Sequence, residues 1–166
     1  MEINVDLTRE DYIDFNKYFF LKKGLKKRIY IVIIIALMIP LIVDYGQPFE
    51  IFTYLKTAVL AGFIFGLIYF GGMMITIKRT GKLPSDNGSL LGKKKFIITD
   101  EGLVEDCESN RNLQKWKGIK SIETNDNSIF IFIDTLVAYV IPKRSFKDEA
   151  EIENFIKIIQ EKIKAT

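Results

Sequence analysis

Residues that could carry out catalysis are scarce in this chain of 166 residues. Histidine, the commonest general base and transition-metal ligand, is absent, and Cys107 is the one cysteine. Asp106 and Glu108 flank Cys107, and carboxylates disfavour the thiolate that a nucleophile or a metal ligand needs. Walker loops, GxSxG and CxxC motifs are also missing. The sequence therefore predicts that the protein is not an enzyme and uses no metal and no cofactor. Residues 105–108 are expected to form an exposed hairpin tip.

Two places in the C-terminal half could instead bind a ligand or a partner. Lys143 and Arg144 would bind an anion or an acidic partner, unless they are simply solvated. Trp116 could be a platform on which a ligand stacks, but the spacing W-x-x-I-x-x-I is also typical of core packing. Both interpretations stay open for each place.

Lys93, Lys94 and Lys95 form a third basic group. Each lysine close to an anionic inner leaflet contributes about 1 kcal/mol of attraction, so we expect this group to dock the protein on the membrane. Residues 96–166 contain ten Lys/Arg and thirteen Asp/Glu, and this acidic balance argues against nucleic acid as a partner.

Two apolar segments indicate that these groups are held at a membrane. Residues 57–77 contain no charged side chain, and a helix of that length spans the roughly 30 Å of hydrocarbon in a bilayer. Residues 29–43 form a second, shorter apolar run, which either spans the bilayer or lies in it as a re-entrant or surface helix. We predict a transmembrane hairpin connected by residues 44–56.

The distribution of basic residues predicts the orientation of this hairpin. Lysine and arginine are concentrated just before the first apolar segment and just after the second, whereas the connection has Lys56 against Asp44 and Glu50. The positive-inside rule then places both termini in the cytoplasm.

Small residues repeat at four-residue spacing in the second apolar segment, at Ala58, Gly62 and Gly66. Such a groove allows close helix packing in lipid. It would receive either the first apolar segment of the same chain or another membrane protein, including a second copy. The absence of an ionisable residue at the centre of either segment argues against a transport site.

Elements on both sides of the hairpin belong to a soluble part. Residues 2–7 alternate as a strand, and residues 9–23 are predicted to form a helix whose aromatic stripe either faces a core or lies at the membrane interface. Further strands are predicted at 95–99, 102–107, 113–117, 119–124, 128–133 and 137–141. Residues 147–164 are predicted to form an amphipathic helix with Ile152, Phe155, Ile156 and Ile159 facing inward.

This order of elements resembles the YcxB-like family of bacterial membrane proteins. The similar residues are FIITDEGLVE at 96–105, the Trp116 pattern and AYVIPKRSF at 138–146. The resemblance implies a soluble part similar to a pleckstrin-homology domain, and a place in the bacterial cytoplasmic membrane. It implies no activity and no catalytic residues. A pleckstrin-homology fold has seven strands, so one hypothesis is that residues 3–7 complete the sheet and the hairpin is an insertion.

The expected fold is an α+β membrane protein, with a two-helix hairpin joined to a small antiparallel sheet that a C-terminal helix closes. The predicted parts are 1–28 (strand and amphipathic helix), 29–77 (hairpin), 78–92 (basic linker) and 93–166 (YcxB-like domain). We expect a non-enzymatic interaction module that binds a protein segment or lipid headgroups at the inner leaflet. The alternative is a structural or regulatory subunit that assembles through its transmembrane helices.

Overall fold

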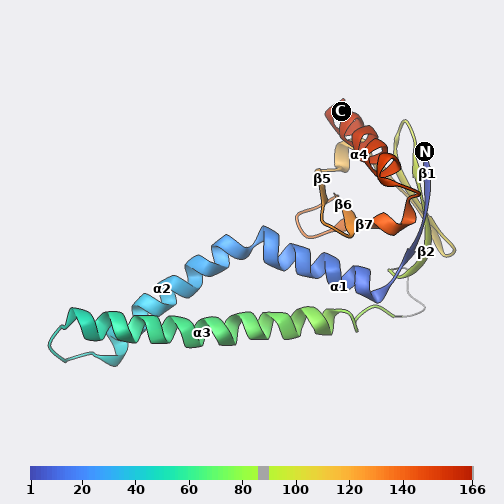
Figure 1. Cartoon of the computed structure of the whole chain (residues 1–166). Coiled ribbons are helices and arrows are strands. Elements are labelled where there is room, and N and C mark those ends of the chain that lie inside the picture. The colour runs from blue at the N-terminus through green and yellow to red at the C-terminus, as the bar shows by residue number, and fades with distance from the viewer. Residues whose placement is uncertain (86–89, 166) are drawn as a thin grey trace. The chain divides into compact units, whose positions relative to one another are not determined.

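The computed structural model describes residues 1–85 and 90–165, and they form two compact units (Figure 1). The first unit combines Met1–Tyr18 with Thr80–Thr166 and holds the strands, whereas the second is the helical segment Phe19–Arg79. The first unit is therefore discontinuous in sequence, and the N-terminal residues fold together with the C-terminal half.

One side of the first unit is an antiparallel sheet with the strand order β1-β2-β3-β4. Its strands are β1 Glu2–Leu7, β2 Gly92–Ile98, β3 Gly102–Cys107 and β4 Asn110–Lys115. β1 pairs along its whole length with β2 and buries Ile3 and Val5. This pairing confirms the hypothesis that the N-terminal strand completes the sheet.

The other side is a second antiparallel sheet, β5-β6-β7, made of Ser121–Thr124, Ser128–Phe132 and Ala138–Pro142. The chain passes between the sheets through the 3-10 turn Trp116–Gly118. The strand predicted over 113–117 is therefore wrong at its end, because β4 stops at Lys115 and the ring of Trp116 turns into the core. The strand predicted over 102–107 is present with the bounds of β3, and the four other predicted strands are present with shifted ends.

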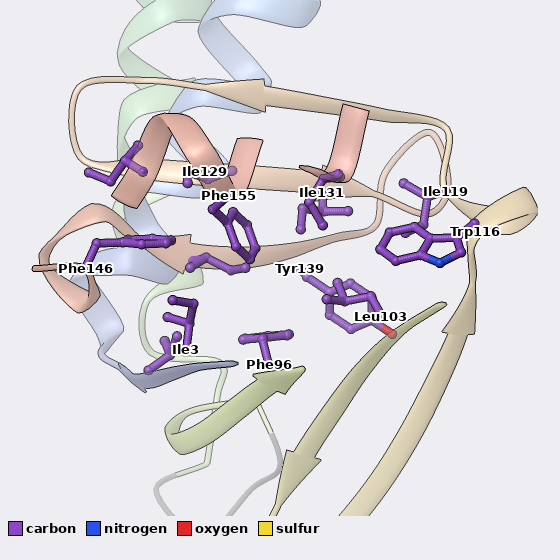
Figure 2. Packing of buried hydrophobic residues seen from close by; sticks show 14 residues of the cluster. Ile3, Phe96, Leu103, Trp116, Ile119, Ile129, Ile131, Tyr139, Phe146 and Phe155 are labelled. Atoms are coloured by element: carbon purple, nitrogen blue, oxygen red, sulfur yellow. The ribbon is translucent and has the colours of Figure 1, made fainter. Parts of the chain in front are cut away.

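The core lies between the sheets and is closed by the C-terminal helix α4, Glu149–Lys164. Figure 2 shows Ile3, Phe96 and Leu103 facing Ile129, Ile131 and Phe155 across this core. Asp148 caps the N-terminus of α4, where its carboxylate accepts a hydrogen bond from the backbone N–H of Glu151 at 2.8 Å. Its inward face is confirmed, since Ile152, Phe155 and Ile159 are buried and Ile156 is partly buried.

Helix α1, Arg9–Tyr18, covers the face of β6 that points away from this core. Its Phe15 ring lies 5.5 Å from Phe130 and 6.2 Å from Phe132, and Tyr18 lies 4.7 Å from Phe130. The Tyr18 hydroxyl donates a hydrogen bond to Glu123 at 2.8 Å. Burial and this carboxylate raise the pKa of Tyr18 to about 12, so the phenol stays neutral. Phe15, a member of the predicted aromatic stripe, therefore packs inside the first unit, on β6.

The second unit contains a π-helical turn, Phe19–Lys23, and two helices, α2 Leu25–Val43 and α3 Ile51–Thr80. α3 has 30 residues and is long and apolar enough to cross a membrane. Because α3 begins at Ile51, the connection between the helices is shorter than the predicted 44–56.

The small residues of α3 face α2 of the same chain. A β-carbon added to Gly62 would lie 3.1 Å from the β-carbon of Ala36, and one added to Gly66 would lie 4.0 Å from Cγ1 of Val32. Ala58 and Ala36 are both buried. The Tyr54 hydroxyl also donates a hydrogen bond to the Leu37 carbonyl at 2.8 Å. Within the chain, the groove of Ala58, Gly62 and Gly66 is thus occupied by α2.

Candidate functional site

The inward face of the four-stranded sheet changes from apolar to polar along its length. Ile3, Phe96 and Leu103 lie at the apolar end. Two residues further along β2 comes Lys94, opposite Cys107 of β3, and Glu105 lies opposite Asn112 of β4. Because alternate residues of a strand share a face, Lys94 follows Phe96 inward, and Glu105 and Cys107 follow Leu103. A polar end of the sheet therefore faces the interior.

Lys94 and Glu105 form an ion pair at this polar end. Nζ of Lys94 lies 2.6 Å from Oε1 of Glu105, and the two side chains are only 7% and 18% exposed. Charges so far removed from water are costly unless each compensates the other. The pair therefore presents a wall that is polar but has no net charge.

Tyr139 extends this polar wall from β7 of the opposite sheet (Figure 2). Its hydroxyl oxygen accepts a hydrogen bond from Nδ2 of Asn112 at 3.1 Å. Burial raises the pKa of Tyr139, the negative charge of Glu105 raises it further, and the hydrogen bond from Asn112 opposes both. The phenol is therefore neutral at physiological pH and keeps a proton to donate.

A pocket of about 340 Å³ opens beside these groups. Lys94, Glu105, Cys107, Asn110 and Tyr139 line its polar side. Its apolar side comes from the end of β1, from α1, from residues 90–91 and from the β6–β7 connection. Leu90, Leu136 and Val137 are exposed at this side. The result is an amphiphilic pocket with an apolar rim.

Cys107 lines this pocket, and its thiol donates a hydrogen bond to the Asn110 carbonyl at 3.2 Å. The expected hairpin is present between β3 and β4, but Glu105 does not lie at its exposed tip, because its side chain pairs with Lys94 inside. Among the described residues, no group of three His, Cys, Asp or Glu side chains could hold a metal ion.

Arg144, a predicted binding residue, forms an ion pair with Asp11 inside the first unit. Its two terminal nitrogens each lie 2.6 Å from an Asp11 carboxylate oxygen, and one also donates to the Asp6 carbonyl at 2.9 Å. Asp11 is buried and also accepts hydrogen bonds from the backbone N–H and the hydroxyl of Thr8. Arg144 therefore links the β7–α4 connection to the start of α1, while Lys143 beside it is partly exposed.

Asp11 should make the stability of the first unit depend on pH. Burial by itself raises the pKa of Asp11, but hydrogen bonds from Arg144 and Thr8 and the guanidinium charge outweigh burial and lower it. The unfolded chain then binds the proton more readily than the folded one. The stabilisation is fully present above the ordinary Asp pKa of about 4 and is lost as the pH falls through the lower folded value.

We expect Asp11→Asn to lower the free energy of unfolding by about 2 kcal/mol near neutral pH, a modest value because Arg144 is half exposed. The cost should shrink in acid. Denaturant unfolding of the full chain, followed by fluorescence of Trp116, the one tryptophan, measures it. Asp126→Asn, at an exposed turn position, is the control and should cost little at either pH. An equal cost of Asp11→Asn at both pH values would contradict this assignment.

The three lysines predicted to dock on the membrane have different positions. Lys93 is exposed, Lys94 is buried against Glu105, and Lys95 forms an ion pair with Glu2. Lys94 therefore does not share an exposed surface with the other two.

Trp116 is only 4% exposed, and its Nε1 donates to the carbonyls of Thr99 and Asp100. This position favours core packing of Trp116 over ligand stacking.

Sequence reasoning missed Lys94, Glu105 and Tyr139 as members of one pocket. The alternation of β2 could have predicted that Lys94 points inward. Lys94 lies two residues from Phe96 on the same strand, so the two side chains share the face that is turned to the core. Because Lys94 stands between two other lysines, all three were interpreted as one exposed basic group. Tyr139 reaches the polar residues of the other sheet only because the two sheets pack together, and local sequence patterns do not encode that packing.

Part of the chain matches a known protein family. Residues 98–159, from the end of β2 into α4, match the model of a family described as YcxB-like protein. The resemblance predicted from the sequence is confirmed for this segment. No curated protein and no solved structure matches the chain.

Proposed function

We propose that this chain, with YcxB-like sequence over residues 98–159, is a non-enzymatic, membrane-anchored interaction module on the cytoplasmic side of a bacterial membrane. The observation that carries the proposal is the amphiphilic pocket between the two sheets, where a neutralised ion pair and a phenol face an apolar wall. A concave, mainly apolar site with a few converging polar groups is the usual form of a ligand site.

The discontinuous first unit supports a two-helix membrane hairpin. β1 and β2 pair with each other, so residues 1–18 and 80–165 must lie on the same side of any membrane. The segment between them must then cross the membrane an even number of times. If α3 crosses once, α2 is the element that crosses back. Its 19 residues are about 28 Å long, and Lys26, Lys27 and Arg28 in its first turn can snorkel to the interface.

The charges at the helix ends support a cytoplasmic position for both termini. α2 begins with basic residues, α3 ends with Lys78 and Arg79, and the connection between the helices has no such excess. Lys93, which is exposed at the start of β2, would add attraction to the anionic leaflet.

The first unit fits the pleckstrin-homology-like architecture that the resemblance implies. Within the described residues, seven strands form two antiparallel sheets, and a C-terminal helix packs on the core between them. We place the binding surface at the pocket rather than at Lys143 and Arg144, since Arg144 is already paired with Asp11. The partner is a protein segment or a lipid that inserts an apolar group at the rim.

Photocrosslinking in cells tests this function. A benzophenone side chain at Leu136, on the exposed rim, should capture a distinct species, and the pocket-filling variant Ala138→Trp should abolish that capture. The same side chain at Lys157, exposed on α4, is the matched control. If both positions capture the same species, or if Ala138→Trp leaves the capture at Leu136 unchanged, the pocket is not the working surface.

The alternative function, assembly through the transmembrane helices, has weaker support. It needs the groove of Ala58, Gly62 and Gly66 for another protein, and α2 of the same chain already packs there. Replacing Gly62 and Gly66 with leucine separates the two functions. Loss of an assembly with an intact first unit would favour the alternative.

A further inference from the structure

We infer that the pocket between the two sheets binds an uncharged amphiphile, with a neutral hydrogen-bonding head group against Lys94, Glu105 and Tyr139. This inference rests on the proposed function, since it names the class of ligand that the same site takes. The polar side of the pocket determines which head group can bind, and the apolar side accommodates the apolar body of the ligand.

The volume limits the ligand to a small molecule or the end of a chain. About 340 Å³ lies at the low end of the range of roughly 300–1,000 Å³ found for small-molecule sites. Leu90, Leu136 and Val137 are exposed beside the apolar wall, so an apolar body can continue from the pocket onto the rim.

The Lys94–Glu105 ion pair excludes a ligand with net charge. An anionic head could bind Lys94 only by drawing it away from Glu105, and the carboxylate would then be a buried, uncompensated charge. A cationic head could bind Glu105 only by drawing it away from Lys94, and the ammonium group of Lys94 would then be the buried, uncompensated charge. Breaking one partner out of a buried pair is strongly unfavourable, whereas a neutral head can bind without disturbing the pair.

Neutral groups that hydrogen-bond have several partners on the polar wall. The neutral Tyr139 hydroxyl can donate to a carbonyl or hydroxyl oxygen. The side-chain amide of Asn110 and the second Glu105 carboxylate oxygen are hydrogen-bonding groups within the lining residues. An amide or alcohol head would satisfy donors and acceptors together, which a simple hydrocarbon would not.

The test uses probes with the same alkyl chain and different heads. Octanamide is neutral, octanoate is an anion and octylamine is a cation near neutral pH, and monooctanoylglycerol represents a neutral lipid. The full chain is held in nanodiscs of neutral lipid, and the readout is the rate at which N-ethylmaleimide alkylates Cys107, the one cysteine, which lines the pocket.

We expect half-maximal protection of Cys107 at a concentration at least tenfold lower for octanamide than for octanoate or octylamine. Exchanging the pair, Lys94→Glu with Glu105→Lys, keeps the wall neutral and should keep this order. Glu105→Gln leaves the Lys94 charge and should move octanoate to first place. Stronger protection by monooctanoylglycerol than by octanamide would point to a bilayer lipid, and the reverse to a soluble ligand; both support the inference.

A relocated cysteine controls for effects of the probes on the membrane. In Cys107→Ser with Glu153→Cys, the thiol is on the exposed face of α4, and no probe should slow its alkylation. Best protection of Cys107 by a charged probe would overturn the inference while leaving a binding pocket. Protection by none of the probes would also overturn it, whereas failure of the proposed function appears separately, in the crosslinking at Leu136.

Discussion

A chain without residues 2–7 is expected to lose the folded structure of its first unit. β1 pairs with β2 along its full length, and Ile3 and Val5 are each 3% exposed. Burial of two such side chains contributes about 3–6 kcal/mol, and the ladder hydrogen bonds are lost with them. Because whole domains are stable by only about 5–15 kcal/mol, removing one strand consumes most of that margin. Trp116 fluorescence and hydrogen exchange of β2 and β3 would measure the loss.

The two faces of β1 provide a matched control for this deletion. Replacing Ile3 and Val5 with serine should reproduce most of the destabilisation, because both side chains enter the core. Replacing Glu2 and Asn4 with serine changes the same strand on its exposed face, and should cost far less than the replacement of Ile3 and Val5. A stably folded fragment of residues 85–166 would show that β1 is dispensable.

Breaking the Lys94–Glu105 pair is the second large expected effect. Lys94→Met leaves the Glu105 carboxylate largely buried without its cation and should cost about 3 kcal/mol, with a similar cost for Glu105→Leu. The double variant removes both charges and should lie within about 1 kcal/mol of the parent protein. Thermal or denaturant unfolding of the four proteins gives the coupling free energy directly.

Lys95 and Glu2 form the control pair on the exposed face of the same strands. Both side chains are substantially exposed, so Lys95→Met should cost much less than Lys94→Met. If the costs of Lys94→Met and Glu105→Leu simply add in the double variant, the two charges do not interact across the pocket. If the double variant is as stable as the parent, the ion pair is not needed for folding, which supports its role in selecting a ligand.

Much of the fold was predictable because its signals are local. The alternation in residues 2–7 and 102–107 predicted strands with their observed bounds, and the period of α4 predicted its buried face. That residues 3–7 join the sheet was a hypothesis based on the seven strands of a pleckstrin-homology fold, and it did not name β2 as the partner strand. In contrast, the corner at Trp116 interrupts a pattern of alternation that would otherwise continue as one strand.

The candidate site was less predictable because it depends on contacts between distant residues. Arg144 and Asp11 are separated by 133 positions, and the sequence alone leaves Arg144 looking like a free cation. Lys94 looked like one of three equivalent basic residues until its pairing register placed it beside Glu105. Charged side chains were interpreted as exposed by default, and the two that matter most for the pocket are exceptions to that rule.

The pairing of β1 with β2 also has a consequence for biosynthesis. The ribosome releases β1 and α1 first, and their partners in the sheet follow only after α2 and α3 have been made. If α2 and α3 form the proposed membrane hairpin, a chain in which only one of them entered the bilayer would hold β1 and β2 on opposite sides and could never close the sheet. Under the proposed topology, folding of the first unit is thus conditional on correct insertion, and an incorrectly inserted chain would present unfolded segments to cellular proteases.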